Sequence, residues 1–205
     1  TIQLSISKFT TRFNIEKDNE KINYMYKRAI RKMLILGAFS FCAFLLISPL
    51  LIKFFHVSES SFLKEYSPFF ITSLFFVSAL LLPIPRGILQ GLQRFLPFGT
   101  NLLLEGLIKI GLGVLLLVLG FGLEGALFTF FASYIITYFV AGYSLKDIKK
   151  LKPKKFDTKI LYSYSYPVII TLTILTAMYT IDMILIKNFL SPENAGFYAA
   201  LSTLG

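Results

Sequence analysis

The sequence predicts an all-α membrane protein, a polytopic helical bundle, from its composition and from the way its charges are distributed. Of the 205 residues, 55% are hydrophobic and 16% charged, whereas soluble domains carry about 25% charge and about 45–50% apolar residues. Long uncharged runs alternate with short basic ones, so the formal net charge of +10 lies mostly between apolar runs. Membrane topology explains such a pattern. A soluble enzyme domain is disfavoured, and the single cysteine, Cys42, cannot form an internal disulfide.

Five apolar runs are long enough to cross a membrane, and a sixth begins near the end. A spanning helix needs about 20 mostly apolar residues, because the hydrocarbon layer is about 30 Å thick and a helix rises about 1.5 Å per residue. The runs cover residues 33–55, 68–84, 102–119, 125–142 and 161–186, with 195–205 as the start of the sixth. Pro68 suits the first turn of its helix, and Asn101 is predicted to cap the third run. The turn at 121–124 makes the third and fourth runs a helical hairpin.

Two prolines interrupt the end of the second run. Pro83 and Pro85 free backbone carbonyls and kink a helix, which transporters tolerate where neighbouring groups satisfy them. We expect the helix to continue past this kink toward Gln90. The motif G-x-G-x-x-G at 120–125 matches a dinucleotide fingerprint, but the apolar runs on both sides indicate a tight turn instead.

The basic residues predict the orientation of the spans. Segment 1–32 carries eight Lys and Arg, the loop after the second run has Arg86 and Arg94, and segment 146–159 has seven lysines. Alternate loops thus carry 17 basic residues against three on the other side, which are Lys53, Lys64 and Lys187. The positive-inside rule predicts a multi-pass protein of the plasma membrane, with residues 1–32 and 144–160 cytoplasmic. Segment 1–32 begins with Thr and is typical of a loop between helices, and the chain stops inside an apolar run, so we expect a fragment.

Three blocks of sequence resemble a known transporter family. They are RGILQGLQRF at 86–95, GFGLEGA at 120–126, and Pro167 followed by IDMILIKNFLSPENAGFY at 181–198. Together they resemble the polysaccharide-transport flippases of the multidrug/oligosaccharidyl-lipid/polysaccharide exporter superfamily, over nearly the whole chain. The resemblance implies two six-helix lobes around a central cavity. It also implies alternating-access flipping of lipid-linked oligosaccharides or polysaccharide precursors, often carried on undecaprenyl diphosphate.

The resemblance also implies a division of the chain and a set of partners. Residues 33–143 would form four transmembrane helices of the first lobe, 144–160 a Lys-rich linker, and 161–205 the start of the second lobe. The implied partners are the lipid bilayer, the lipid-linked oligosaccharide, and glycosyltransferases or a polymerase of the same pathway. We expect no nucleic-acid partner and no enzyme activity, because the sequence has no nucleic-acid fold signature, nucleophile elbow, paired carboxylates or metal-ligand spacing.

The third run contains the first candidate binding residues. An ionisable side chain inside a span costs roughly 2.5–3.5 kcal/mol on insertion scales and marks a functional candidate. Glu105 and Lys109 are four residues apart and share one helix face with Asn101. The hypothesis is that this face lines a cavity and that Lys109 binds a diphosphate or a sugar acid. The alternative is a self-neutralised ion pair buried between helices, or one that snorkels from the membrane interface.

Other candidates lie at the cavity mouth and on the fifth run. Arg86 and Arg94 could bind lipid phosphate, or could serve topology alone. Thr173, Thr176 and Thr180 lie on one polar stripe of the fifth run, which lines a wet cavity or bonds a neighbouring helix. Asp182 lies on another face and is a candidate coupling site for a proton or sodium ion, or a structural partner of an adjacent helix. We expect no cofactor beyond that coupling ion and no metal site.

Two alternative functions remain open at this point. One is a cation-coupled multidrug exporter of the same superfamily, and the other is a non-transporting membrane scaffold of a glycan-assembly complex. Acidic cavities should favour cationic drugs, whereas a closed, dry core around the buried charges would favour the scaffold.

Overall fold

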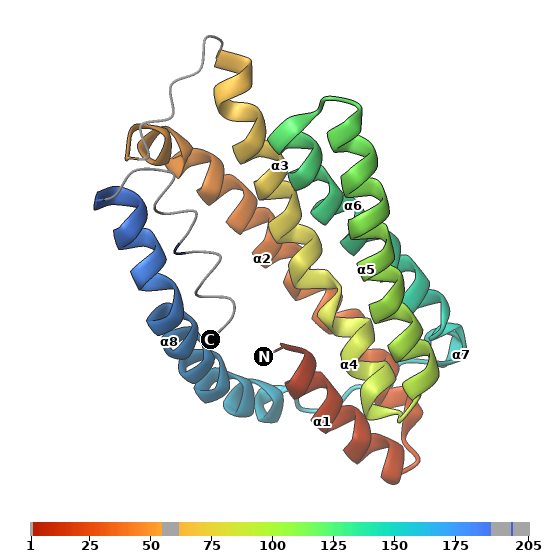
Figure 1. The fold of residues 1–205 in the computed structure, drawn as a ribbon. Coiled ribbons are helices and arrows are strands. Elements are labelled where there is room, and N and C mark those ends of the chain that lie inside the picture. The colour runs from red at the N-terminus through yellow and green to blue at the C-terminus, as the bar shows by residue number, and fades with distance from the viewer. Residues whose placement is uncertain (1, 55–61, 190–197, 199–205) are drawn as a thin grey trace. The chain divides into compact units, whose positions relative to one another are not determined.

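The computed structural model describes residues 2–54, 62–189 and 198, and the elements of this part are helices joined by turns (Figure 1). The helices are α1 (Ile2–Ile15), α2 (Asn19–Phe54), α3 (Phe62–Leu81), α4 (Pro83–Gly91), α5 (Phe95–Val118), α6 (Gly122–Tyr143), α7 (Lys146–Lys150) and α8 (Lys159–Phe189). The chain divides into two compact units, one covering Ile2–Leu161 and the other Tyr162–Gly205 together with Thr1.

The all-α polytopic membrane fold predicted from the sequence is confirmed. Four helical segments are long and apolar enough to cross a membrane. They are Asn19–Phe54, Tyr66–Gly91, Phe95–Val118 and Gly122–Tyr143. The predicted fifth span lies in α8, whose described apolar part, Tyr166–Met178, is shorter. The count of five spans therefore stays a prediction, and the predicted sixth run lies outside the described residues apart from Tyr198.

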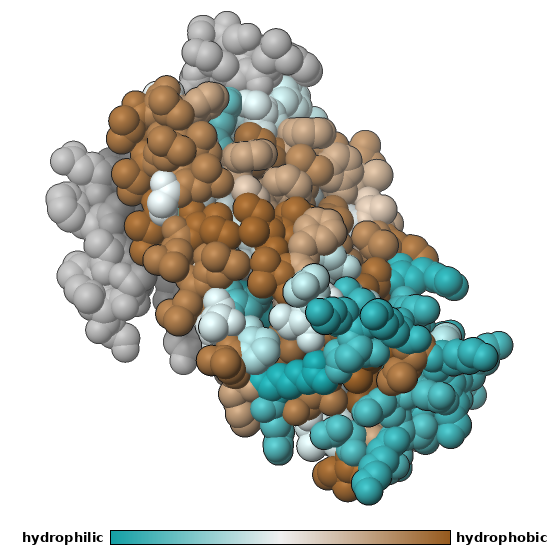
Figure 2. All heavy atoms as spheres, turned by 90° about the vertical axis from the view of Figure 1, so that its right-hand side faces the viewer, coloured by the Kyte–Doolittle hydropathy of each residue, from teal (hydrophilic) through white to brown (hydrophobic). Residues whose placement is uncertain are grey.

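The four long segments pack side by side within the first unit. Helix α2 contacts α3, α3 contacts α6, and α6 contacts α5, while α1 packs against α4 (Figure 1). Figure 2 shows hydrophilic residues gathered at the lower end of the visible face, where Figure 1 places α1 and α7, and hydrophobic residues above them. This segregation fits a bundle that meets lipid over most of its length and water at its end.

Residues 2–15 and 19–32 are helical, so the interpretation of segment 1–32 as a loop was wrong. Ile6, Phe9 and Phe13 lie on one face of α1 and are buried, and such three- and four-residue spacing is the pattern of an amphipathic helix. The chain reverses at Lys17, which has a positive φ of 57°. From Asn19 onward it runs straight into the apolar part of α2. Apart from Lys17 in the turn, the basic residues of this segment therefore lie on helices.

The proline positions are partly as predicted. Helix α3 begins at Phe62, so Pro68 lies in its interior and not in the first turn. Helix α3 ends at Leu81 and α4 begins at Pro83, with Leu82 between them. The continuation of the second span past the double proline is thus confirmed. Pro83 suits its place because a first-turn residue needs no amide hydrogen bond within the helix.

Two glycines of α4 allow it to approach α1 closely. A Cβ atom at Gly87 would lie 2.7 Å from the carbonyl oxygen of Gln3, and one at Gly91 would lie 2.5 Å from that of Ser7. The Thr11 hydroxyl donates to the Gly91 carbonyl at 3.1 Å. Small residues four apart let helix backbones meet in this way, which explains the two glycines of the block at 86–95.

The predicted hairpin between α5 and α6 is confirmed. Helix α5 ends at Val118 and α6 begins at Gly122, with positive φ values of 85° at Gly120 and 52° at Gly122. The amide of Gly120 donates to Leu117 at 3.0 Å and that of Phe121 to Leu116 at 3.0 Å. This pair of bonds is the Schellman arrangement that ends a helix with a left-handed glycine. The glycines therefore serve the turn.

Candidate functional site

A network of charged side chains lies inside the first unit, between α4 and α5. Arg86 Nη1 lies 2.6 Å from Glu105 Oε2, and the other carboxylate oxygen of Glu105 pairs with Lys109 one turn further along α5. We call Arg86, Glu105 and Lys109 the charge network. The sequence predicted the shared face of Glu105 and Lys109, but it assigned Arg86 to the cavity mouth and did not pair it with Glu105. Arg86 is instead a buried helical residue, 7% exposed.

Asn101 connects the charge network to a third helix. Its side-chain oxygen accepts a hydrogen bond from Arg86 Nε at 2.7 Å, and its amide nitrogen donates to the Thr137 carbonyl of α6 at 2.8 Å. Asn101 is fully buried inside α5, which begins six residues earlier at Phe95. Its predicted role as the helix cap is therefore wrong. Its real position, between an arginine and a backbone carbonyl, satisfies polar groups that would be costly to bury alone.

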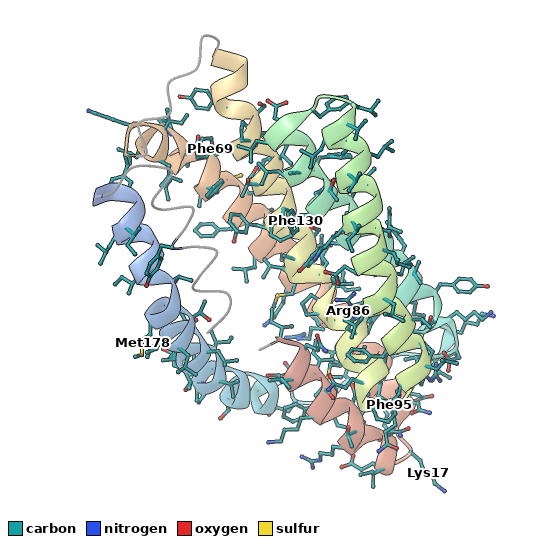
Figure 3. The ribbon with its side chains drawn as sticks, viewed as in Figure 1. Lys17, Phe69, Arg86, Phe95, Phe130 and Met178 are labelled. Carbon is teal, nitrogen blue, oxygen red and sulfur yellow. The ribbon has the colours of Figure 1, made fainter. Side chains whose placement is uncertain are left out.

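Lys109 is the most exposed member of the charge network. Its side chain is 28% exposed, against 12% for Glu105 and 9% for Arg86. The ammonium lies 4.9 Å from the ring centroid of Tyr134 and 5.3 Å from that of Phe130, both on α6. These are cation–π distances. Figure 3 labels Arg86, which belongs to α4, and Phe130, which belongs to α6.

The charge network is not neutral. It holds two cations and one carboxylate, a formal charge of +1, and in the described part of the chain no second carboxylate forms an ion pair with it. A buried excess charge is costly unless a partner balances it. The arrangement can therefore accept an anionic group next to Lys109, where the side chain is accessible. It offers no nucleophile or paired acid and base.

Arg94 lies outside the charge network. Its guanidinium pairs with both carboxylate oxygens of Asp147 and also donates to the Ser144 carbonyl at 3.0 Å. The hydrogen bonds from Arg94 hold the pKa of the Asp147 carboxyl below its usual value. Arg94 thus fastens the turn between α4 and α5 to the start of α7.

The candidates of the fifth run lie in the second unit. Thr176 and Thr180 are exposed, and each hydroxyl donates to the carbonyl four residues earlier, at 2.8 Å and 2.9 Å. Thr173 and Thr176 line an open hollow of about 390 Å³ on α8. The Asp182 side chain lies outside the described residues. Within the described residues, no group of three or more His, Cys, Asp or Glu side chains could hold a metal ion.

Sequence reasoning missed the contribution of α6. Thr129, Ser133 and Thr137 are buried and spaced four residues apart along one face of this helix. That row was readable as a polar face inside an apolar helix, and it marks the side that meets the charge network through Thr137. Tyr134 and Phe130, by contrast, carry no sequence signal that separates them from the many other aromatic residues.

A family model described as "polysaccharide biosynthesis protein" matches residues 2–205, essentially the whole chain. No curated protein and no solved structure matches significantly.

Proposed function

We propose that this chain, which belongs to the polysaccharide biosynthesis family of flippases within the multidrug/oligosaccharidyl-lipid/polysaccharide exporter superfamily, moves lipid-linked oligosaccharide or polysaccharide precursors across the plasma membrane by alternating access. Family membership and the apolar helices make it a multi-pass membrane protein fit for exporting polysaccharide precursors in general. The specific substrate, the mechanism and the membrane are our proposal. So are the cytoplasmic placement of residues 1–32 and 144–160 and the pairing with glycosyltransferases or a polymerase of the same pathway.

The observation that supports this proposal is the formal charge of +1 on the charge network. The diphosphate of a lipid carrier is an anion that would balance this charge in a poorly hydrated setting, where electrostatic attraction is strong. A cationic drug would instead add to the excess. The charge therefore favours the glycan precursor over the multidrug alternative, and we assign Lys109 as the side chain that contacts the phosphate.

Glu105 gives the network a way to respond to the substrate. A bound diphosphate competes with Glu105 for the Lys109 ammonium. When Lys109 turns away, the carboxylate still has Arg86 as its partner, and Asn101 holds Arg86 in place through two contacts, one of 2.7 Å and one of 3.3 Å. Because Glu105 is never left without a cationic partner, Lys109 can move between Glu105 and the diphosphate reversibly and at a small cost in free energy. In this mechanism Arg86 and Asn101 are positioning residues.

The remaining candidates take secondary places in the proposal. Asp182 stays our candidate for coupling transport to a proton or sodium ion. Thr173, Thr176 and Thr180 stay candidates for contacts to the glycan. Arg94 is the weakest candidate for substrate phosphate, because Asp147 already occupies its guanidinium.

Transport by the reconstituted protein tests the proposal. The assay measures movement of a labelled lipid-linked oligosaccharide across proteoliposomes for wild type, Lys109→Ala and Lys109→Arg. Lys146→Ala is the matched control, because Lys146 also lies over a tyrosine ring, 4.8 Å from the Tyr143 centroid, but outside the charge network. We expect Lys109→Ala to lower the initial rate at least tenfold, with Lys109→Arg retaining most activity and Lys146→Ala unchanged. A folded Lys109→Ala protein that transports at the wild-type rate would overturn the assignment.

A further inference from the structure

A basic pocket lies at the charged end of the first unit, well away in sequence from the charge network. It has a volume of about 430 Å³ and lies between α2 and the segment that follows α7. Its lining residues are Tyr24, Lys27, Arg28, Arg31, Pro153 and Lys155. Four of these six side chains are cationic and none is acidic. We call it the basic pocket.

The wall from α2 brings three cations onto one helix face. Tyr24, Lys27, Arg28 and Arg31 are spaced three, four and seven residues from the first, so their side chains lie together. Lys27 and Arg31 are four apart, a spacing at which like charges repel each other. In the described part of the chain, neither of these two forms an ion pair with a carboxylate. The Arg28 guanidinium donates to the Tyr24 hydroxyl at 3.1 Å, which turns both side chains toward each other.

The opposite wall is held in place by contacts that do not use its own cation. The Asn23 amide donates to the carbonyls of Leu151 and Lys149, and the Lys154 amide donates to the Glu20 carbonyl at 3.2 Å. The Lys154 ammonium lies 3.3 Å from Asp18. Hydrogen bonds from Lys21, which has the larger effect, and from Lys154 hold the pKa of Asp18 below its usual value.

Phe156 completes the attachment on the other side of Lys155. Its ring packs edge-on against Phe13 and Tyr24, with ring centroids 4.8 Å and 5.7 Å apart. Lys155 is therefore fixed between two anchors, at Lys154 and Phe156, and lines the pocket that three cations of α2 also line. No carboxylate within the described residues forms an ion pair with Lys155. The fold thus gathers like charges in one pocket, an arrangement that favours a bound anion.

The depth of the basic pocket indicates where that anion is carried. The uncharged stretch of α2 begins at Met33, two residues after Arg31. At about 1.5 Å per residue, the cations from Lys27 to Arg31 lie within about 10 Å of the start of the apolar stretch. That is the level of lipid headgroups beside a helix that crosses the membrane. Figure 2 shows the same change, from a hydrophilic end to a hydrophobic region.

We propose that the basic pocket binds the phosphate group of an anionic lipid headgroup. Arg31 provides planar donors that suit phosphate oxygens, and the two lysines provide compact charges around them. The pocket is separate from the proposed transport site at Lys109, so its occupant need not be the transported precursor. A soluble phosphate shares this chemistry, and only the lipid is held at the membrane surface.

Direct lipid binding tests the proposal on the purified protein. Native mass spectrometry measures retention of dioleoyl phosphatidic acid, with dioleoyl phosphatidylcholine as the uncharged-headgroup comparison. The double variant Arg31→Gln/Lys155→Gln removes one cation from each wall. The matched control, Lys150→Gln/Lys152→Gln, removes the same charge from exposed lysines of the same linker, outside the lining residues. We expect the pocket variant to bind phosphatidic acid at least tenfold more weakly and the control less than twofold more weakly.

The outcomes separate the two sources of phosphate and non-specific attraction. Equal losses in the pocket variant and the control would overturn the proposal, because total charge alone would then explain binding. Displacement of phosphatidic acid by millimolar inorganic pyrophosphate would also overturn it, in favour of a soluble ligand. If the double variant does not fold, the single variant Lys155→Gln replaces it, because Lys155 is an exposed residue of the linker. Transport measured on Lys109→Ala has no bearing on either result, so the two proposals can fail independently.

Discussion

Breaking the pair between Arg86 and Glu105 should destabilise the first unit in an asymmetric way. Glu105→Leu leaves two cations, Arg86 and Lys109, without their shared carboxylate, and removal of one partner from a buried ion pair costs about 3–5 kcal/mol. Arg86→Met leaves the carboxylate paired with Lys109, so its cost should be nearer 1–3 kcal/mol, roughly that of an unsatisfied buried polar group. The leucine variant should therefore be the less stable of the two.

The double variant measures the coupling between the two side chains. Arg86→Met/Glu105→Leu removes both buried charges and leaves only Lys109, whose 28% exposed side chain can extend toward solvent or headgroups. Replacement of a whole buried pair by apolar residues is often close to neutral. We therefore expect the double variant to be at least 1 kcal/mol more stable than the sum of the single changes predicts.

Thermal unfolding in detergent, followed by circular dichroism, gives the required energies. In a chain of this length, 1 kcal/mol corresponds to a shift in Tm of about 2–4 °C, so Glu105→Leu should lower Tm by roughly 6–20 °C. Glu16→Gln is the control, since this carboxylate forms an i,i+4 pair with Arg12 at 2.9 Å but is 39% exposed. It should lower Tm by no more than about 2–4 °C. Additive losses in the double variant, within about 0.5 kcal/mol, would refute the buried network.

Three smaller predictions use the same assay. Gly91→Ala should cost about 1–3 kcal/mol, because its Cβ would lie 2.5 Å from the Ser7 carbonyl oxygen, whereas Gly99→Ala, with open space around it, should be neutral or stabilising. Gly120→Ala should cost about 1–2 kcal/mol, since φ is 85° there, and a loss no larger than that of Gly99→Ala would contradict this. Asp147→Asn should lower Tm slightly at pH 7 and not at low pH. The hydrogen bonds from Arg94 lower the pKa of Asp147 and stabilise the fold only while the carboxyl is ionised. This contribution is lost as pH falls below about 4. A Tm difference between wild type and Asp147→Asn that does not change with pH would contradict this prediction.

The sequence predicted the spans best where the requirement was length and apolarity alone. The hairpin between α5 and α6 follows from two apolar runs and a glycine turn, and the structure reproduces it within a few residues. The start of α5 was misplaced because Asn101 is a good cap by its chemistry. Only its partners decide otherwise, and Arg86 and Thr137 lie 15 and 36 residues away along the chain.

The candidate site was predictable only in its local part. Glu105 and Lys109 are visible as neighbours because helical spacing fixes them. Arg86 follows two prolines, past which the sequence still predicted a helix, but a basic residue there locally indicates the membrane boundary. Its buried position depends on the carboxylate of Glu105, and on α4 continuing beyond the prolines while packed against α1. Such tertiary stabilisation overrides a local signal and leaves no mark near the residue itself.

The different attachment of the two cations predicts that stability and transport respond to different substitutions. Arg86 is held by Glu105 and by two contacts to Asn101, so its loss should be seen mainly in Tm. Lys109 shares the carboxylate with Arg86 and is partly exposed, so Lys109→Ala leaves a paired Glu105 and should lower Tm by less than half the Arg86→Met shift. In the proposed mechanism it should nevertheless lower transport more strongly, because Lys109 contacts the phosphate. Unfolding and transport measured on the same two purified variants would show this reversed order, and an identical order in both assays would mean that Lys109 acts only through stability.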